Sequence, residues 1–162
     1  ILRFSTAFGL SPRMRFDLTI NQFTRSIYNK EKLEVFDSNT WRPYCHVNDF
    51  ALALEKVIEA DDKLTNFEVF NVGGDKNNFT KKQITELVLK SIPNAESVSY
   101  TEKKLDPRNY RVDFSKIDKK LDFKIKYSVE DGIEEIVDYL KNSKISMNKF
   151  NSDLFGNYLV NL

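Results

Sequence analysis

Two short apolar segments constrain the fold of this chain more than any other feature. The segments ILRF, at residues 1–4, and FEVFNV, at residues 67–72, read as buried strands of one parallel sheet. Patterns of helical period lie between and after them, and strands that alternate with helices are typical of α/β proteins. Two strands alone do not make a stable sheet, because a parallel sheet needs further strands and helices on both faces. The chain also opens without Met in an apolar run, so we expect a piece of a longer protein.

The remaining elements follow from side-chain spacing and helix-capping chemistry. We expect a helix of about three turns from Asp17 and a second helix capped by Asn48, with its apolar face formed by Phe50, Leu54, Val57 and Ile58. Strands are expected in KLEVF (32–36), RPYCHV (42–47), SVSYTE (97–102) and NYRVDF (109–114), a loop in STAFGLSPRMRF (5–16), and a loose terminal helix after residue 142. Three pairs predict further helix starts, namely Thr80 with Gln83, Ser115 with Asp118 and Ser128 with Asp131.

The charge balance argues against several classes of partner. The 25 Lys and Arg residues nearly cancel the 24 Asp and Glu residues, so no broad basic field exists to hold nucleic acid or an anionic membrane. No apolar run approaches the roughly 20 residues that span a bilayer, and a single Cys cannot form an internal disulfide. We therefore expect a cytoplasmic protein, without nucleic-acid or membrane partners, that binds anions through local clusters.

The segment TWRPYCHVNDF, at residues 40–50, contains the only Trp, Cys and His of the chain. Adjacent strand residues point to opposite faces, so Cys45 and His46 cannot share a metal ion, and zinc needs about four ligands. We expect no metal site here. We interpret His46 as a structural residue bonded to backbone or to a carboxylate, and Asp49 as support for the start of the following helix.

Five segments occur in the order and spacing of one known family. They are LRFSTAFGLSPRMRF, LEVF, WRPYCHVNDFALAL, FNVGG and DPRNYRVDFSKI. Over residues 1 to about 140, the chain resembles the carboxyl-terminal half of the NAD-dependent epimerase/dehydratase family, extended short-chain dehydrogenases that act on nucleotide sugars. The resemblance implies an α/β fold, with the last strands of a Rossmann-type parallel sheet and a small α/β substrate-binding domain.

The resemblance also implies a division of the chain into five segments. Residues 1–16 would end the Rossmann sheet and form a loop, and residues 17–66 would hold substrate-binding and connecting elements. Residues 67–77 would be a returning Rossmann strand, residues 78–142 the carboxyl-terminal substrate-binding domain, and residues 143–162 a terminal tail.

Two motifs of the family are absent from this chain. Its members bind NAD through a G-x-x-G-x-x-G turn at a helix N-terminus, and their proton transfer uses a Y-x-x-x-K pair. Neither occurs here in a fitting context. The resemblance thus implies that NAD is bound mainly by a missing amino-terminal half, so we assign no catalytic or cofactor-binding residue. The chain alone is expected to be inactive, and the full-length enzyme to be a homodimer.

The resemblance assigns seven substrate-binding residues. A nucleotide sugar carries a diphosphate with about two negative charges, which the planar fork of Arg suits well. Arg42 and Arg108 match two diphosphate-facing arginines, expected outside the core, and Arg13 matches an arginine at the sugar-side mouth. Glu34 and Phe36 lie in the base-holding strand, and Thr6 and Asn21 lie near the sugar and the nucleotide. The alternatives are surface arginines and an ordinary edge strand.

Two functions from different classes remain open. The first is the substrate-binding half of an NAD-dependent nucleotide-sugar epimerase or dehydratase. The second is a non-catalytic α/β module that binds a nucleotide or a protein. The sequence leaves open the sugar, the base, and the choice among epimerisation, dehydration, decarboxylation and reduction.

Overall fold

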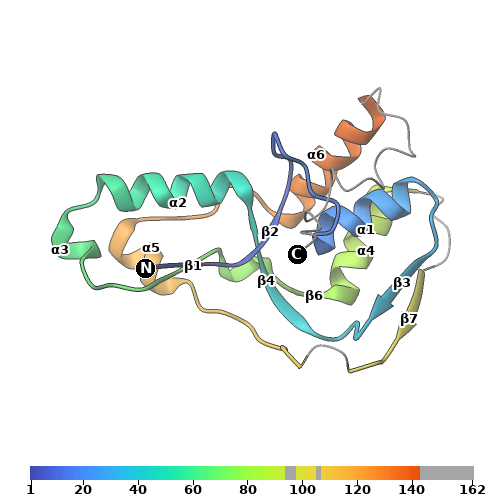
Figure 1. Ribbon diagram of the computed structural model, residues 1–162, viewed down its shortest axis with the longest axis horizontal. Helices are drawn as coiled ribbons and strands as arrows, with labels where there is room; N and C mark the ends of the chain where they lie inside the picture. Colours follow the sequence, from blue (N-terminus) through green and yellow to red (C-terminus); the bar gives the residue numbers. More distant parts are fainter. Residues whose placement is uncertain (94–97, 105–106, 143–162) are drawn as a thin grey trace, which may run out of the picture.

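The fold combines short, mostly parallel strands with helices (Figure 1). The computed structural model describes residues 1–93, 98–104 and 107–142. In chain order the elements are β1 (Leu2–Phe4), β2 (Thr6–Phe8), α1 (Thr19–Tyr28), β3 (Leu33–Phe36), β4 (Trp41–His46), α2 (Val47–Glu59), α3 (Asp62–Thr65), β5 (Phe70–Val72), the 3₁₀ helix η1 (Asp75–Asn77), β6 (Asn78–Thr80), α4 (Lys81–Ser91), β7 (Val98–Thr101), α5 (Ser115–Leu121) and α6 (Val129–Asn142).

Strand pairing confirms the predicted parallel sheet and adds three pairings. β1 and β5 are parallel, with Leu2 opposite Phe70, as expected for the two apolar segments. β2 and β4 are also parallel, β6 pairs antiparallel with the start of β4, and β3 pairs with β7. The loop prediction for residues 5–16 was wrong at β2, because Thr6–Phe8 form a strand against β4.

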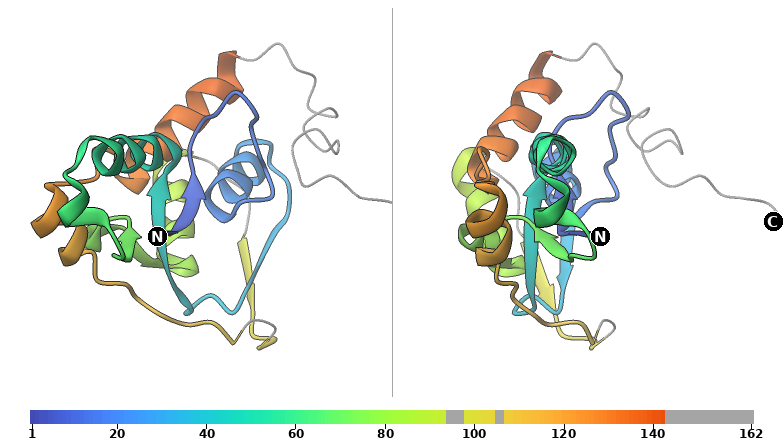
Figure 2. Two further views of the ribbon diagram at one scale, coloured as in Figure 1. Left: turned by 60° about the vertical axis from the view of Figure 1, so that its left-hand side comes forward. Right: turned by 90° about the vertical axis from the view of Figure 1, so that its left-hand side faces the viewer.

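β4 separates two apolar cores. Phe8 and Tyr44 pack in the first core, together with side chains from α1, α4 and α6. Cys45 packs in the second core with Phe70 and with side chains from α2 and α5. Adjacent residues of a strand point to opposite faces, which explains why neighbours in β4 enter different cores. Figure 1 shows the second group of elements at left and the first at right, and in the right-hand view of Figure 2 α4, α5 and α6 line one side of β4.

Two of the predicted helix caps are confirmed and two are wrong. Thr80 forms a reciprocal capping box with Gln83. Ser128 forms one with Asp131, whose carboxylate accepts the Ser128 amide at 2.7 Å. By contrast, α2 is capped by His46 and not by Asn48. Ser115 lies inside α5, where its amide donates to the carboxylate of Asp113 at 2.7 Å.

Other expectations differ from the structure in part. The segment 109–114 is no strand, although the Tyr110 amide donates to the Trp41 carbonyl at 3.3 Å. The apolar face of α2 is only partly covered, since Leu54 and Ile58 are exposed. The predicted terminal helix after residue 142 lies outside the described residues. In the part of the chain that the structure describes, no helix is long and apolar enough to cross a bilayer. The division into five segments stays a prediction.

Candidate functional site

One face of the β2–β4 pair brings two of the predicted site residues, Thr6 and Arg42, together with Tyr44. Arg42 and Tyr44 lie two positions apart in β4 and therefore share a face. Thr6 of β2 is in register with Tyr44. Residues in register on paired strands point to the same side of a sheet, so Thr6, Tyr44 and Arg42 form one continuous polar row.

Arg42 is buried, which corrects the expectation that it lies outside the core. Only 8% of the residue is exposed, and its guanidinium donates to the carbonyls of Trp41 and Arg108. The guanidinium carbon lies 5.3 Å from the centre of the Tyr110 ring. The structure therefore brings Arg42 to the main chain of Arg108, whereas Arg108 itself is exposed.

Sequence analysis missed Tyr44. Its side chain is buried in the first core, and its hydroxyl lies close to Thr19 but makes no hydrogen bond of good geometry among the described residues. Burial raises the pKa of the Tyr44 hydroxyl, and the neighbouring Arg42 charge and Thr19 oppose that rise. A buried hydroxyl without a partner is costly. Its position two residues after Arg42 is the signal that would have identified it.

Glu34 and Phe36 lie in β3, beside β7. The Glu34 carboxylate accepts the Thr101 hydroxyl at 2.7 Å. The Phe36 carbonyl accepts the Lys81 ammonium at 2.8 Å, and the Lys103 ammonium lies 4.1 Å from the centre of the Phe36 ring. Two Lys side chains thus place positive charge at the end of β3.

Asn21 is buried and organises the loop between β2 and α1. Its amide oxygen accepts the Gly9 amide at 3.0 Å, and its amide nitrogen donates to the Arg15 carbonyl at 2.9 Å. Arg13 lies between these contacts and is exposed. Asn21 therefore joins the two ends of the loop that carries Arg13.

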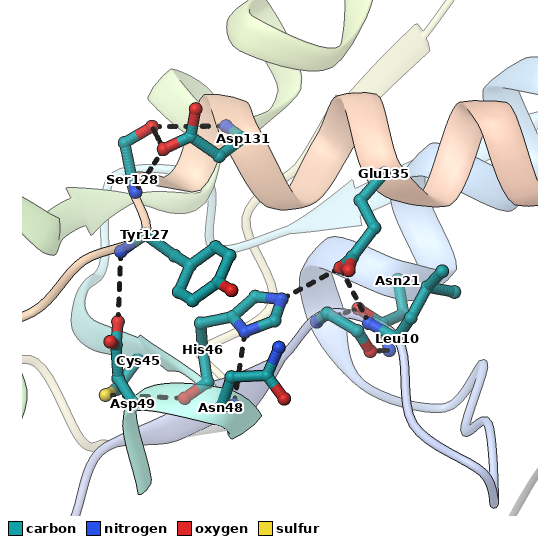
Figure 3. A network of polar contacts seen from close by, with 11 residues as sticks. Leu10, Asn21, Cys45, His46, Asn48, Asp49, Tyr127, Ser128, Asp131 and Glu135 are labelled. Atoms are coloured by element: carbon teal, nitrogen blue, oxygen red, sulfur yellow. Dashed lines mark hydrogen bonds and ion pairs between the residues drawn. The ribbon is translucent and has the colours of Figure 1, made fainter. Parts of the chain in front are cut away.

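His46 has the structural role expected for it. Its imidazole is fully buried, and Nε2 lies 2.9 Å from the Glu135 carboxylate (Figure 3). The expected role of Asp49 was wrong in detail, because this buried carboxylate accepts the amides of Lys126 and Tyr127 at 2.9 and 3.2 Å, ahead of α6. Among the described residues, no group of three or more His, Cys, Asp or Glu side chains is arranged to hold a metal ion.

The glycine pair after β5 does not fit the diphosphate of NAD. A phosphate cradle needs open backbone amides at a helix N-terminus. A Cβ on Gly74 would meet Ile125 at 2.4 Å, and one on Gly73 would meet Phe114 at 2.7 Å. Only the three-residue turn η1 and the strand β6 follow. The two glycines therefore allow close packing against Ile125 and Phe114.

Comparison with known proteins finds similarity to one family. Residues 1–73 match the NAD dependent epimerase/dehydratase family. A UDP-glucuronate 4-epimerase of Thermodesulfobacterium geofontis is 28% identical over 145 residues, which cover 88% of this chain and 43% of that protein. The low-salt glycan biosynthesis protein Agl12 of Haloferax volcanii is 30% identical, with 83% of this chain and 43% of that protein covered. Over residues 1–73 the chain is thus similar to the NAD-dependent epimerase/dehydratase family.

Solved structures agree with this assignment. A UDP-glucose 4-epimerase from Thermotoga maritima, in complex with UDP-glucose, matches with a TM-score of 0.74 and 26% identity, over 86% of this chain and 45% of that one. A UDP-glucuronic acid 4-epimerase from Bacillus cereus, at 24% identity and a TM-score of 0.71, shares the fold over 87% of this chain and 44% of its own. The chain thus spans less than half the length of these relatives. NAD is the cofactor of the family.

Proposed function

We propose that this chain is the nucleotide-sugar-binding half of an NAD-dependent nucleotide-sugar epimerase or dehydratase. The rest of the protein would bind NAD and carry the catalytic groups. The proposal is supported by relatives named as UDP-sugar epimerases and by the described residues, in which the glycine pair does not fit NAD. The cytoplasmic location and the homodimer stay predictions for the whole protein.

The observation that carries the proposal is the pair of Arg42 and Tyr44 on one face of β4. Both side chains are buried, and the backbones of the two residues lie about 7 Å apart along the strand. A diphosphate would accept hydrogen bonds from the Arg42 guanidinium, and such bonds to charged oxygens are stronger than neutral ones.

The order of the strands suggests how the ligand lies. The base would lie at the end of β3, beside Glu34 and Phe36, and the diphosphate would lie at Arg42, six residues after Phe36. The sugar would extend along β4 towards Thr6, which is in register with Tyr44. The exposed side chains of Arg108 and Arg13 would then approach the diphosphate and the sugar, respectively.

The exposed apolar surface supports the view that the rest of the protein covers this half. Ile1 and Ile58 are both 80% exposed, and Phe4, Leu54 and Phe67 are also exposed. They lie on β1, on α2 and in the segments next to these elements, which face away from the first core. Exposed apolar side chains in one region mark a surface that is buried by a partner or by more chain.

Equilibrium titration of the full-length protein tests the proposal. We expect a nucleoside diphosphate, with or without its sugar, to bind more tightly than the matching monophosphate, and Arg42→Ala to abolish most of that difference. Arg25→Ala is the matched control, since Arg25 is also mostly buried but contacts Ser26 and Glu31. Equal affinity for mono- and diphosphates in the wild type would contradict the proposal and favour a non-catalytic module.

A further inference from the structure

The loop between β2 and α1 rests directly on the ring of His46. Gly9 has a φ of +99°, and a Cβ at this position would lie 2.0 Å from Nε2 of His46. A side chain therefore has no space here, and the left-handed backbone also favours glycine. The first residue of the loop is thus held against a buried imidazole.

One carboxylate oxygen connects this loop to α6. Oε2 of Glu135 accepts the Nε2–H of His46 at 2.9 Å and the amide of Leu10 at 3.0 Å. Figure 3 shows Glu135 reaching from its helix to both partners. The side chain of Glu135 thus links α6 to the end of β4 and to the start of the loop.

His46 is itself fixed in the orientation that this contact needs. Its Nδ1 accepts the Asn48 amide at 3.2 Å, so the proton of the neutral ring lies on Nε2 and points to Glu135. Tyr127 stacks on the ring with centroids 4.3 Å apart, and Phe8 meets it edge-on at 5.3 Å. The imidazole is therefore a rigid support for the loop.

The other end of the loop is fixed as well. Asn21 holds the Arg15 carbonyl, and the side chain of Met14 is buried in the first core. Between these contacts and Leu10 lie Ser11, Pro12 and Arg13, with Arg13 exposed. The contacts of Glu135 therefore help to fix the position of the exposed part of the loop, residues 11–13.

We propose that Glu135 is a positioning residue, which holds the loop of residues 9–15 so that Arg13 faces the sugar end of the ligand. This inference rests on the proposed nucleotide-sugar function. In this proposal Glu135 acts through Leu10 and His46 and not by contact with the ligand. Its helix packs into the first core through Ile133, Ile136 and Leu140, so the two hydrogen bonds of Glu135 are not needed to dock α6.

Tryptic cleavage after Arg13 measures the loop directly in the full-length protein. Loss of a hydrogen bond to a charged group shifts a local equilibrium by about tenfold or more. We therefore expect Glu135→Ala to raise the cleavage rate at Arg13 by about tenfold, with no matching rise at other sites. Glu135→Gln keeps an acceptor oxygen and should stay within about twofold of wild type. Glu134→Ala, on the exposed face of the same helix, is the matched control.

Ligand affinity provides the second measurement. Apparent affinity falls in proportion to the fraction of protein in the competent state, so Glu135→Ala should raise the Kd for a nucleotide sugar about two- to tenfold. Arg13→Ala should weaken binding in the wild type and have little further effect in the Glu135→Ala background. A general loss of stability would not produce this non-additivity or the rescue by Gln.

Three outcomes would overturn the inference. They are unchanged cleavage at Arg13 in Glu135→Ala, equal cleavage increases at all sites, and fully additive losses of affinity with Arg13→Ala. Failure of the proposed function is distinguishable, because the wild-type protein would then bind no nucleotide sugar. The cleavage at Arg13 would still report whether Glu135 holds the loop.

Discussion

Replacement of Arg42 by Ala is expected to have two separate effects, one on ligand affinity and one on stability. In the proposed complex the guanidinium donates to the diphosphate. Hydrogen bonds to charged groups contribute roughly 1.5–3 kcal/mol, so affinity should fall about ten- to a hundredfold at about 1.4 kcal/mol per decade. Arg42→Lys should recover only part of this loss, because an ammonium cannot reproduce the planar fork.

The stability effect follows from the burial of Arg42. The substitution removes the bonds to the carbonyls of Trp41 and Arg108 and the contact with the Tyr110 ring. We expect a loss of about 1–3 kcal/mol in the free energy of unfolding, or a few degrees in Tm.

Calorimetric titration well below the melting transition separates the two effects. Arg25→Ala should lower Tm without a change in nucleotide-diphosphate affinity. Arg108→Ala should weaken binding with a smaller change in Tm, because its side chain is exposed. Unchanged affinity in Arg42→Ala, Arg108→Ala and the double variant would refute the reasoning and leave these arginines without a role in binding.

Three further predictions concern stability. Asp49→Asn should lower the free energy of unfolding by about 2–3 kcal/mol in chemical denaturation, since one of the amides of Lys126 and Tyr127 would lose its acceptor; a loss below about 0.5 kcal/mol would count against this role. Hydrogen bonds from Ser128 lower the pKa of Asp131. The ionised Asp131 carboxylate should therefore add about 1 kcal/mol to the free energy of unfolding above about pH 4, and this stabilisation should be lost as pH falls through the lowered pKa. Asp131→Asn should remove this pH-dependent stabilisation. If the free energy of unfolding of the wild type and of Asp131→Asn changed with pH in the same way, the prediction would be wrong. The isolated chain should melt broadly by circular dichroism, because its exposed apolar surface is not covered; a sharp two-state melt of a soluble monomer would oppose this view.

The helices were largely predictable because their signals are local. The apolar period of α1 and the capping boxes of α4 and α6 lie within a few residues, and these predictions are confirmed. The cap of α2 was not predictable from residue type, because the His46 ring takes the role assigned to Asn48. β2 was missed because its three residues form a strand only through pairing with β4, which lies 38 positions further along the chain.

The site was less predictable because its contacts join distant segments. The burial of Arg42 depends on the carbonyl of Arg108, 66 residues away, and on the ring of Tyr110. The carboxylate partner expected for His46 is confirmed, but its identity as Glu135, 89 residues away, has no local signal. The alternation that places Tyr44 beside Arg42 was visible in the sequence. It became informative only once the hydroxyl was known to be buried.

Hydrogen exchange of the full-length protein, followed by mass spectrometry, tests most directly whether this half of the protein binds the nucleotide sugar. The account predicts that a nucleoside diphosphate sugar slows exchange in peptides that cover residues 33–46, and that NAD alone leaves these peptides unchanged. Protection of residues 33–46 by NAD, without protection by the nucleotide sugar, would contradict the account.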